Sequence, residues 1–410
     1  MKKTLALFSL SLGIAFVNPD SSVVAQVTIP QPVTIPVPQT EPTTPEVVPA
    51  LQPINPKAAC NRKRCIGWDE QLWGRRGDRK ALLTSIDHSL RYLETNTAKE
   101  IYAKYPIPEI TLDRVRRSLL RFRQILVSSR SAKELRAAVH REFVFYQSIG
   151  NDGKGTVKFT AYYSPVYEAS RVRTSVYKYP LYQVPPDFKE WEKPHPKRVE
   201  LEGKDGLLGK KSKLSGLEML WFSDRFTPYM IHIQGSATIK LTNGKTTSVG
   251  FAGGTDYPWT SIGRELAKDG KLPLSGLTMP KLISYFRNNP KEMNNYLPRW
   301  ERFVFFRETN NAAPRGSINV PVTAERSIAT DKSLMPPGAL ALINNSFPFP
   351  AGRGRLRNRR VDRFVLDQDT GSAIKGPGRV DYFMGVGKLA GDRAGITGGR
   401  GSLYYLLLKE

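Results

Sequence analysis

The chain is predicted to be mainly β with helices at its N-terminal end, and three observations support this fold class. From residue 69 to about 150, apolar residues recur at helical spacing. After Gly150 the pattern changes to short alternating runs separated by glycine and proline, which is typical of an antiparallel β domain or barrel. With 410 residues and 40% hydrophobic content, the chain is long enough to form two or more domains.

Residues 1–25 are interpreted as a secretion signal, because Lys2 and Lys3 precede an apolar run that ends in small and polar residues. A short buried helix is the alternative for this run. No later segment is apolar over a length that could span a bilayer. No cysteine closely follows the run, so the sequence predicts no lipid anchor.

Residues 26–60 are predicted to be a disordered, proline-rich tether. Nine of the residues from 26 to 56 are proline, and only Glu41 and Glu46 are charged. Such a composition favours an extended chain over a packed core. The tether would hold the folded part at a distance from the N-terminus.

The charge of the chain favours a polyanionic partner. There are 62 lysine and arginine residues against 37 acidic ones, a formal net charge of +25. Nucleic acid, anionic lipid and acidic cell-wall polymers would all suit this charge. Export would keep the protein away from the genome, so no nucleic acid is expected as a partner; a chain retained in the cytoplasm would reopen that hypothesis.

The cysteines and histidines predict no metal site. Cys60 and Cys65 could form a small disulfide loop in an oxidising compartment, or remain free thiols, and the sequence leaves both open. The four histidines have no ligand spacing relative to these cysteines or to each other.

The sequence predicts three N-terminal helices. One apolar stripe runs from Leu83 to Leu93, and a second follows the cap residue Thr111. Ser131 opens a third helix with a capping-box pattern that continues through Phe143. A helical interlude is expected from 259 to 300, and the arginine-rich GRGRLRNRR at 352–360 is expected to be an exposed loop. The expected strands are TVKFTAYYSPVYEA, KYPLYQVPP, YMIHIQGSATIKL, KTTSVGFAGG, RFVFFRE, ALALINN, RFVLDQD and SLYYLLL.

The segment DQDTGSAIKGPGRVDYFMG, residues 367–385, places three aspartates around a glycine-proline turn. A type II turn at 376–379 would join two hairpin strands and place Asp381 opposite Ile374. Strand alternation puts Asp381 on the same face as Phe383. A carboxylate among apolar neighbours has a raised pKa, which a general acid near neutral pH requires. The simpler alternative is that each aspartate caps a turn or pairs with an arginine.

Other catalytic motifs are absent: there is no nucleophile elbow, no phosphate-binding glycine loop and no His-Glu-Xaa-Xaa-His sequence. Over roughly 150 to 410 the chain instead resembles the membrane-bound lytic murein transglycosylase A family. The segments that carry the resemblance, in order, are FTAYYSPV, YMIHIQGSA, SIGRELAKDGKL, VFFRE, RSIATDKSLMPPGAL and DTGSAIKGPGRVDYFMGVGKLAGDRAG.

The resemblance implies a double-psi β-barrel domain, a smaller inserted β domain, and a groove between them that holds a glycan strand. It assigns the helices and the first part of the barrel to 61–166 and the inserted domain to 167–313. The C-terminal part of the barrel, a three-aspartate (3D) domain, is assigned to 314–410.

The family's signature aspartates match Asp381, Asp369 and Asp331. The match implies that Asp381 is the catalytic acid and that the other two support it. One extra residue in the PGRVD turn leaves the register of Asp381 open. Tyrosines suit sugar stacking, although a tyrosine on a barrel strand can equally be core. The substrate-binding residues implied by the motifs are Thr160, Tyr162, Tyr163, Gln234, Gly235 and Lys375.

The implied activity is that of a peptidoglycan lytic transglycosylase without a cofactor. Such an enzyme cleaves the β-1,4 bond between N-acetylmuramic acid and N-acetylglucosamine and leaves 1,6-anhydromuramyl ends, with one aspartate acting first as acid and then as base. The expected partners are peptidoglycan glycan strands, with cell-wall synthases and amidases as further candidates. The expected location is the periplasm, in association with the cell wall or outer membrane. A non-catalytic module that binds or loosens wall glycan is the alternative.

Overall fold

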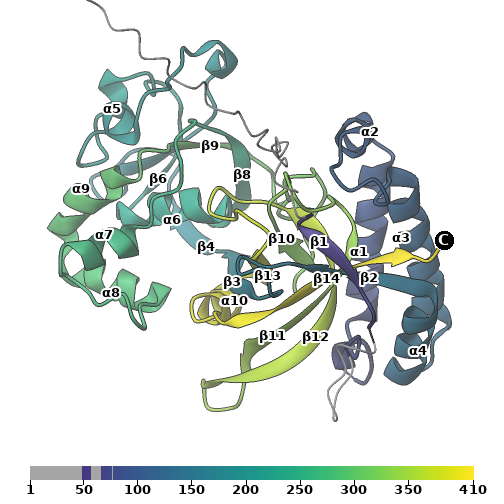
Figure 1. The fold of residues 1–410 in the computed structure, drawn as a ribbon. Helices are drawn as coiled ribbons and strands as arrows, with labels where there is room; N and C mark the ends of the chain where they lie inside the picture. The colour runs from purple at the N-terminus through teal and green to yellow at the C-terminus, as the bar shows by residue number, and fades with distance from the viewer. Residues whose placement is uncertain (1–48, 57–65, 76) are drawn as a thin grey trace, which may run out of the picture. The chain divides into compact units, whose positions relative to one another are not determined.

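The computed structural model describes residues 49–56, 66–75 and 77–410. The predicted secretion signal, most of the predicted tether, and Cys60 and Cys65 lie outside these residues. Across the described ranges, no helix has both the length and the apolar character needed to cross a membrane. The described strands form one large sheet and two smaller ones (Figure 1).

The large sheet closes into a barrel. Its strand order is β1-β2-β14-β11-β12-β10-β13-β3, and β14 also pairs with β3, so that β14, β11, β12, β10, β13 and β3 form a ring. Two neighbouring pairs are parallel, β10 with β12 and β13 with β3. The strands are β1 (Leu51–Ile54), β2 (Phe143–Ser148), β3 (Val157–Ser164), β10 (Ser327–Ala329), β11 (Leu340–Pro350), β12 (Leu356–Asp369), β13 (Arg379–Val386) and β14 (Arg400–Leu408). The closed barrel and the N-terminal helices confirm the predicted fold class.

Alternation along β13 separates a core face from an outer face. Val380 and Tyr382 are fully buried in the barrel core, where the ring of Tyr382 stacks on Phe347 with centroids 4.5 Å apart. Burying each such side chain stabilises the fold by about 1.5 to 3 kcal/mol. Asp381 lies between these two residues in sequence, and therefore projects from the opposite face of the strand.

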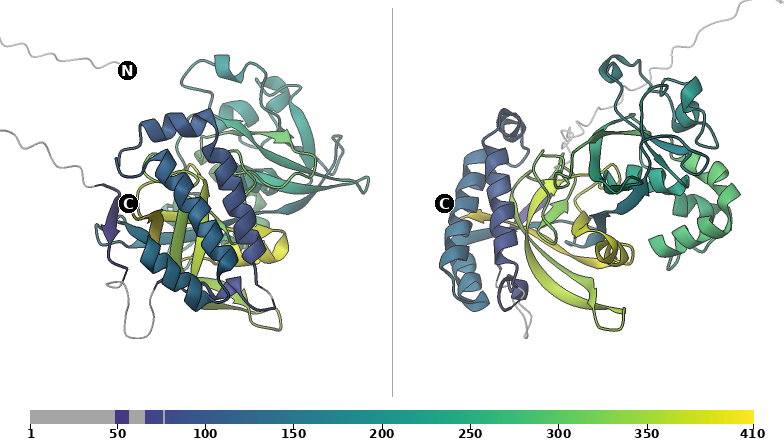
Figure 2. Two further views of the ribbon diagram at one scale, coloured as in Figure 1. Left: turned by 90° about the vertical axis from the view of Figure 1, so that its right-hand side faces the viewer. Right: turned by 180° about the vertical axis from the view of Figure 1, so that it is seen from behind.

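The N-terminal helices pack along one side of the barrel, as Figure 2 shows. They are α1 (Arg79–Leu93), α2 (Asn96–Ala103), α3 (Leu112–Ser128) and α4 (Ala132–Glu142). Thr111 and Ser131 cap α3 and α4 through their side chains, as predicted. The third predicted helix is shorter than expected, because Phe143 begins β2. There its buried ring packs edge-on against Phe122 at 6.2 Å.

The remaining strands and helices, from 166 to 308, have their own core around Trp300, Phe286 and Ile231. One sheet has the order β4-β7-β8-β9, and β5 pairs with β6. The elements are β4 (Val166–Ala169), β5 (Tyr179–Tyr182), α5 (Arg198–Glu202), β6 (Glu218–Phe222), α6 (Phe226–Gln234), β7 (Ser236–Leu241), β8 (Thr246–Gly254), α7 (Ile262–Lys268), α8 (Met279–Asn288), α9 (Met293–Tyr296) and β9 (Val304–Glu308). Helix α10 (Lys388–Ala394) lies between β13 and β14 in the chain. The domain limits at 166 and 313 stay predictions.

The predicted hairpin around Gly376 is wrong. Residues 370–378 form turns and loop rather than a strand. Asp381 pairs with Ala329 of β10 and with Thr160 of β3, not with Ile374. The positive φ angle, 82°, belongs to Gly376, the first residue of the predicted turn, so the turn is not of type II at that position. The strand partners of β13 are distant in sequence, which local turn signals could not reveal.

The predicted strand YMIHIQ is also wrong, because these residues lie in helix α6. Phe226 and the run from Pro228 to His232 are buried, so the helix is enclosed on nearly every side. A fully buried helix has no amphipathic period, and its short apolar run cannot be told from a buried strand by pattern alone.

Two further segments form more strand than expected. Leu51–Ile54, within the predicted tether, pairs with β2 as an edge strand, where a proline is tolerated. The arginine-rich segment 352–360 is a loop only in its first part, since β12 begins at Leu356 and pairs with β11. Its charged side chains remain exposed, as a solvated strand end allows.

Candidate functional site

The three signature aspartates converge through strand β10. Asp369 is the last residue of β12, and Asp381 lies in β13. Both are register partners of the same residue, Ala329, which lies between them on β10. Two strand spacings therefore separate their Cα atoms, roughly 10 Å. Asp331 follows β10 by two residues, so one short strand positions all three acids.

Asp381 receives one hydrogen bond from the described residues. Thr160 Oγ1, on the adjacent parallel strand β3, donates to Asp381 Oδ1 at 2.6 Å. Asp381 Oδ2 has no such partner and is not an enclosed atom. Burial raises the pKa of Asp381, while the Thr160 hydrogen bond and the charge of Arg379 oppose the rise and the charge of Asp369 adds to it. The carboxyl group is thus inclined to hold a proton and has one oxygen free to contact a ligand.

Asp369 accepts hydrogen bonds at both of its carboxylate oxygens, unlike Asp381. Its Oδ2 accepts the hydroxyl of Tyr162 at 2.7 Å, and its Oδ1 accepts the backbone N–H groups of Ser317 at 2.9 Å and Thr370 at 2.8 Å. Burial raises the pKa of Asp369, and these three donors oppose the rise. A carboxylate with both oxygens occupied is positioned to act through its charge rather than by transferring a proton.

Asp331 holds the loop that leads into β13. Its Oδ2 accepts the N–H of Gly376 at 2.9 Å, and its Oδ1 accepts the N–H and the hydroxyl of Ser333. Lys375 Nζ lies 3.8 Å from Asp331 Oδ1, although the lysine side chain is mostly exposed. Burial tends to raise the pKa of Asp331, but the donors and Lys375 outweigh burial and the pKa is lowered. Asp331 therefore differs from the other two acids, since its charged form is favoured.

The predicted substrate-binding tyrosines lie on β3 with Thr160. The ring of Tyr162 packs against Phe383 with centroids 5.1 Å apart, and its hydroxyl is the donor to Asp369. The ring of Tyr163 closely approaches Gly391 of α10, where a Cβ atom would lie 2.7 Å from the ring. These contacts give both tyrosines a packing role in the folded protein.

Gln234 and Gly235 connect β3 with the end of α6. Gln234 Oε1 accepts the backbone N–H of Tyr163 at 3.2 Å. Gly235 ends the helix with a φ of 73°, a left-handed conformation that glycine adopts without strain. Their contacts position β3, and a direct role for either residue in substrate binding stays a prediction.

The sequence interpretation missed Asp367, whose carboxylate is fully buried in the barrel. Thr330 Oγ1 and the Tyr405 hydroxyl each donate to Asp367 Oδ2 at 2.7 Å, and Lys332 Nζ pairs with Oδ1. Lys332 also weakly opposes the raised pKa of Asp369. The available signal was a carboxylate inside the apolar run RFVLDQD, which needs a partner when buried.

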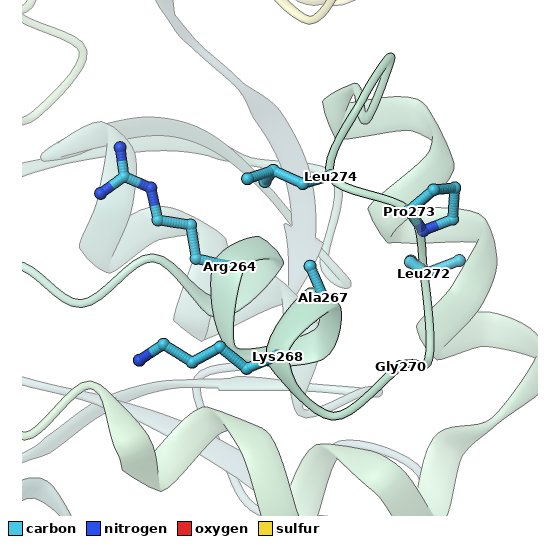
Figure 3. Close-up of a pocket in the computed structure, with 7 residues that line it drawn as sticks. All are labelled: Arg264, Ala267, Lys268, Gly270, Leu272, Pro273 and Leu274. Atoms are coloured by element: carbon cyan, nitrogen blue, oxygen red, sulfur yellow. The ribbon is translucent and has the colours of Figure 1, made fainter.

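Within the described ranges the signature aspartates belong to no candidate metal site, and they do not line the cavity beside α7. The described part of the chain has no group of three or more His, Cys, Asp or Glu side chains that could hold a metal ion. A cavity of about 710 Å³ lies beside α7, and none of the aspartates is among its lining residues. Its lining residues, drawn in Figure 3, are Arg264, Ala267, Lys268, Gly270, Leu272, Pro273 and Leu274.

Comparisons with known proteins agree with this arrangement. The family models for the MltA specific insert domain and the 3D domain match residues 158–307 and 326–407. A membrane-bound lytic murein transglycosylase A homolog from Buchnera aphidicola is 31% identical over 253 residues, 61% of this chain and 66% of that protein. Membrane-bound lytic murein transglycosylase A of Escherichia coli K12 is 28% identical over 263 residues, 64% of this chain and 68% of that protein.

A solved structure shows the same fold. The crystal structure of Escherichia coli MltA with bound chitohexaose has a TM-score of 0.65 at 24% sequence identity, covering 86% of this chain and 94% of that one. The sequence matches span about two thirds of the curated relatives, and the structural match spans nearly all of the solved chain. The chain belongs to the membrane-bound lytic murein transglycosylase A family, whose members are peptidoglycan lyases.

Proposed function

We propose that this chain is a lytic transglycosylase that cleaves the β-1,4 bond between N-acetylmuramic acid and N-acetylglucosamine in peptidoglycan. The observation that carries the proposal is the difference between the three aspartates. Asp381 alone combines a raised pKa with an oxygen that no described residue occupies. The curated relatives are murein transglycosylases, and the matched Escherichia coli structure binds chitohexaose, a chain of the same β-1,4 linkage type.

In the proposed reaction Asp381 acts twice. As an acid it protonates the glycosidic oxygen while the bond to C1 of the muramyl residue breaks. As a carboxylate it then takes the proton from the C6 hydroxyl of the same residue, whose oxygen bonds to C1 and forms a 1,6-anhydro ring. No water is consumed. One carboxyl group is sufficient for both steps, whereas a hydrolase needs a second one to activate or replace water.

Asp369 and Asp331 have supporting roles in this proposal. In its ionised form, which the Tyr162 hydroxyl and two backbone N–H groups favour against burial, Asp369 would stabilise the positive charge that develops at C1 in the oxocarbenium-like transition state. Asp331 would hold the loop that carries Gly376 and Lys375 against the end of β13. Tyr162 would keep Asp369 in place, and Thr160 would do the same for Asp381.

The same proposal covers location and partners. Relatives named as membrane-bound murein enzymes support action at the cell wall. The secretion signal, the periplasmic location and the absence of a lipid anchor concern residues outside the described ranges and stay predictions. Glycan strands are the proposed substrate; cooperation with synthases or amidases stays a prediction.

The test is mass spectrometry of the products from purified peptidoglycan, incubated with the mature chain or with Asp381→Asn. We expect anhydromuropeptides, which are one water lighter than hydrolysis products, and a loss of at least about a thousandfold in the variant, typical of removing a catalytic proton donor. Reducing-end products would indicate a hydrolase. Retained binding without cleavage by the wild-type chain would favour the non-catalytic wall-binding module instead.

A further inference from the structure

Three cations lie in one row across neighbouring strands beside Asp381. Lys158 of β3 is the register partner of both Arg379 of β13 and Arg400 of β14. Side chains of directly paired residues leave the same face of a sheet with Cβ atoms about 5 Å apart. We call Lys158, Arg379 and Arg400 the cationic row.

The cationic row shares the outer face of β13 with Asp381. Arg379 precedes Asp381 by two residues, so both side chains leave the strand on the same side, with Cα atoms about 7 Å apart. The charge of Arg379 lowers the pKa of Asp381, and the charge of Asp381 acts back on Arg379. The row therefore lies next to the group proposed to carry the chemistry.

Arg264 of α7 adds a fourth charge from outside the barrel. Its charge acts on both Lys158 and Arg379, lowering the pKa of each in the same direction as burial. In Figure 3 the side chain of Arg264 leaves α7 on the side away from Leu272 and Pro273. Cations contributed by two separate parts of the fold thus act on the same small region.

No acidic side chain of the described residues forms a close ion pair with these four cations. None of the ion pairs within 4.0 Å among those residues includes Lys158, Arg379, Arg400 or Arg264. Nη1 of Arg379 is buried without a hydrogen-bond acceptor. The contrast with Arg326 is clear, because that buried guanidinium pairs with Asp69 and Asp78. A buried donor without an acceptor destabilises the folded protein, and a bound anion would supply the missing acceptor.

We propose that the cationic row, together with Arg264, is a subsite for a carboxylate group of the peptidoglycan strand. This inference rests on the proposed function, since it places the anion next to the bond that Asp381 would cleave. Carboxylates reach a glycan strand from two sources. One is the lactyl group of muramic acid, which is free where the stem peptide has been removed; the other is the stem peptide itself.

The test measures binding rather than cleavage, in the Asp381→Asn variant, at 150 mM salt so that diffuse attraction is screened. The probes are three soluble glycan oligomers of equal length. The first retains its stem peptides, the second has been stripped by an amidase and carries free lactyl carboxylates, and the third has been stripped and its carboxylates converted to methylamides. Dissociation constants are compared with those of the same protein carrying Lys158→Gln and Arg400→Gln. Arg379 is left intact, because it also acts on residue 381.

The matched control carries Lys99→Gln and Arg116→Gln, which remove the same charge from exposed positions on α2 and α3. We expect at least one anionic oligomer to bind about tenfold more tightly than the neutral one, as one charge-assisted hydrogen bond provides. The row variant should lose this preference, and the control should keep it. Which anionic oligomer is preferred identifies the source of the carboxylate.

Equal binding of neutral and anionic oligomers, or a preference that survives in the row variant, would overturn the subsite. If the row variant fails to fold by circular dichroism, Arg264→Gln replaces it under the same criteria. The proposed function is judged separately by the product analysis. If the chain cleaves peptidoglycan but does not prefer anionic oligomers, only the carboxylate subsite is contradicted. If it prefers anionic oligomers but does not cleave, only the proposed enzymatic activity is contradicted.

Discussion

The hydroxyl group of Thr160 shifts the balance between the protonated and the charged form of Asp381. Burial favours the protonated form of the carboxyl, whereas the hydrogen bond from Thr160 favours the charged form. A residue that must give and then accept a proton works best with a pKa near the operating pH. Thr160 thus limits the rise in the pKa of Asp381 that burial produces. Because Thr160 is the register partner of Asp381 on β3, strand pairing fixes the geometry of their hydrogen bond.

Replacing this hydroxyl should move the pH profile. In Thr160→Val the charged form of Asp381 loses its donor, so its pKa rises further, and the alkaline limb of kcat/KM moves to higher pH by about one unit. The measurement is cleavage rate against pH, with Thr246→Val on the exposed start of β8 as the control. An alkaline limb that stays in place would show that Asp381 is not the titrating acid.

At this scale the sequence predicted the face of Asp381 but not its partner. Alternation places Asp381 on the face opposite Val380 and Tyr382, and the structure buries those two side chains in the barrel core. The expected neighbour, Ile374, came from a local hairpin, whereas the real donor, Thr160, is 221 residues away. The alternation of side chains follows from the sequence of a single strand. The pairing of strands in a closed barrel depends on contacts between segments that are distant in sequence.

Among the elements, a buried ion network holds the segment before α1 against the barrel. Asp69, the cap of the short helix η1 (Glu70–Leu72), is 1% exposed. It accepts the backbone N–H of Phe364 at 3.0 Å and contacts the guanidinium groups of Arg326 and Arg363. One carboxylate thus connects η1, the segment before β10, and β12.

Removing that carboxylate should destabilise the whole fold. Asp69→Ala leaves two buried guanidinium groups short of a counter-charge, at a cost of about 3 to 5 kcal/mol. The measurement is the urea midpoint of unfolding. Asp113→Ala, which breaks the exposed pair with Arg117 on α3, is the control and should change stability by less than about 0.5 kcal/mol. Similar shifts in both variants would contradict the assigned role of Asp69.

Helices and strands were predicted correctly where the sequence pattern that marks them is local. Thr111 and Ser131 were recognised as caps because the capping pattern lies within four residues. Strand β2 was missed because it follows α4 directly at Phe143, with no glycine or proline to mark the change. Helix α6 was taken for a strand because its burial on nearly every side removes the helical period.

At the scale of the molecule, the acids of the site act on stability in opposite directions. The native pKa of Asp381 lies above its ordinary value of 3.8, so the native state binds more protons than the unfolded state above that value. Its contribution to stability therefore falls as pH rises from 3.8 through the native pKa. The native pKa of Asp331 is lowered, so its contribution is present above 3.8 and is lost as pH falls through the native value.

Two matched substitutions should reveal these signs. Asp381→Asn should raise Tm at pH 7, with a smaller effect at pH 4, and Asp331→Asn should lower Tm at pH 7, again with a smaller effect at pH 4. Each kcal/mol moves Tm by about 1 °C in a chain of this size, because the entropy of unfolding grows with the number of residues. Thermal unfolding at both pH values is the measurement. A loss of stability in Asp381→Asn at pH 7 would show that the buried carboxyl is not strained by its charge.

The strand order also determines when the barrel can close during synthesis of the chain. Thr160 is synthesised well before Asp381, which accepts its hydrogen bond. The ring of barrel strands closes only when β14 pairs with both β3 and β11. A chain without β14 would leave one edge of β3 and one edge of β11 unpaired, so the barrel would not close. The geometry of the proposed site therefore depends on closure by a strand, β14, that contributes none of the three signature aspartates.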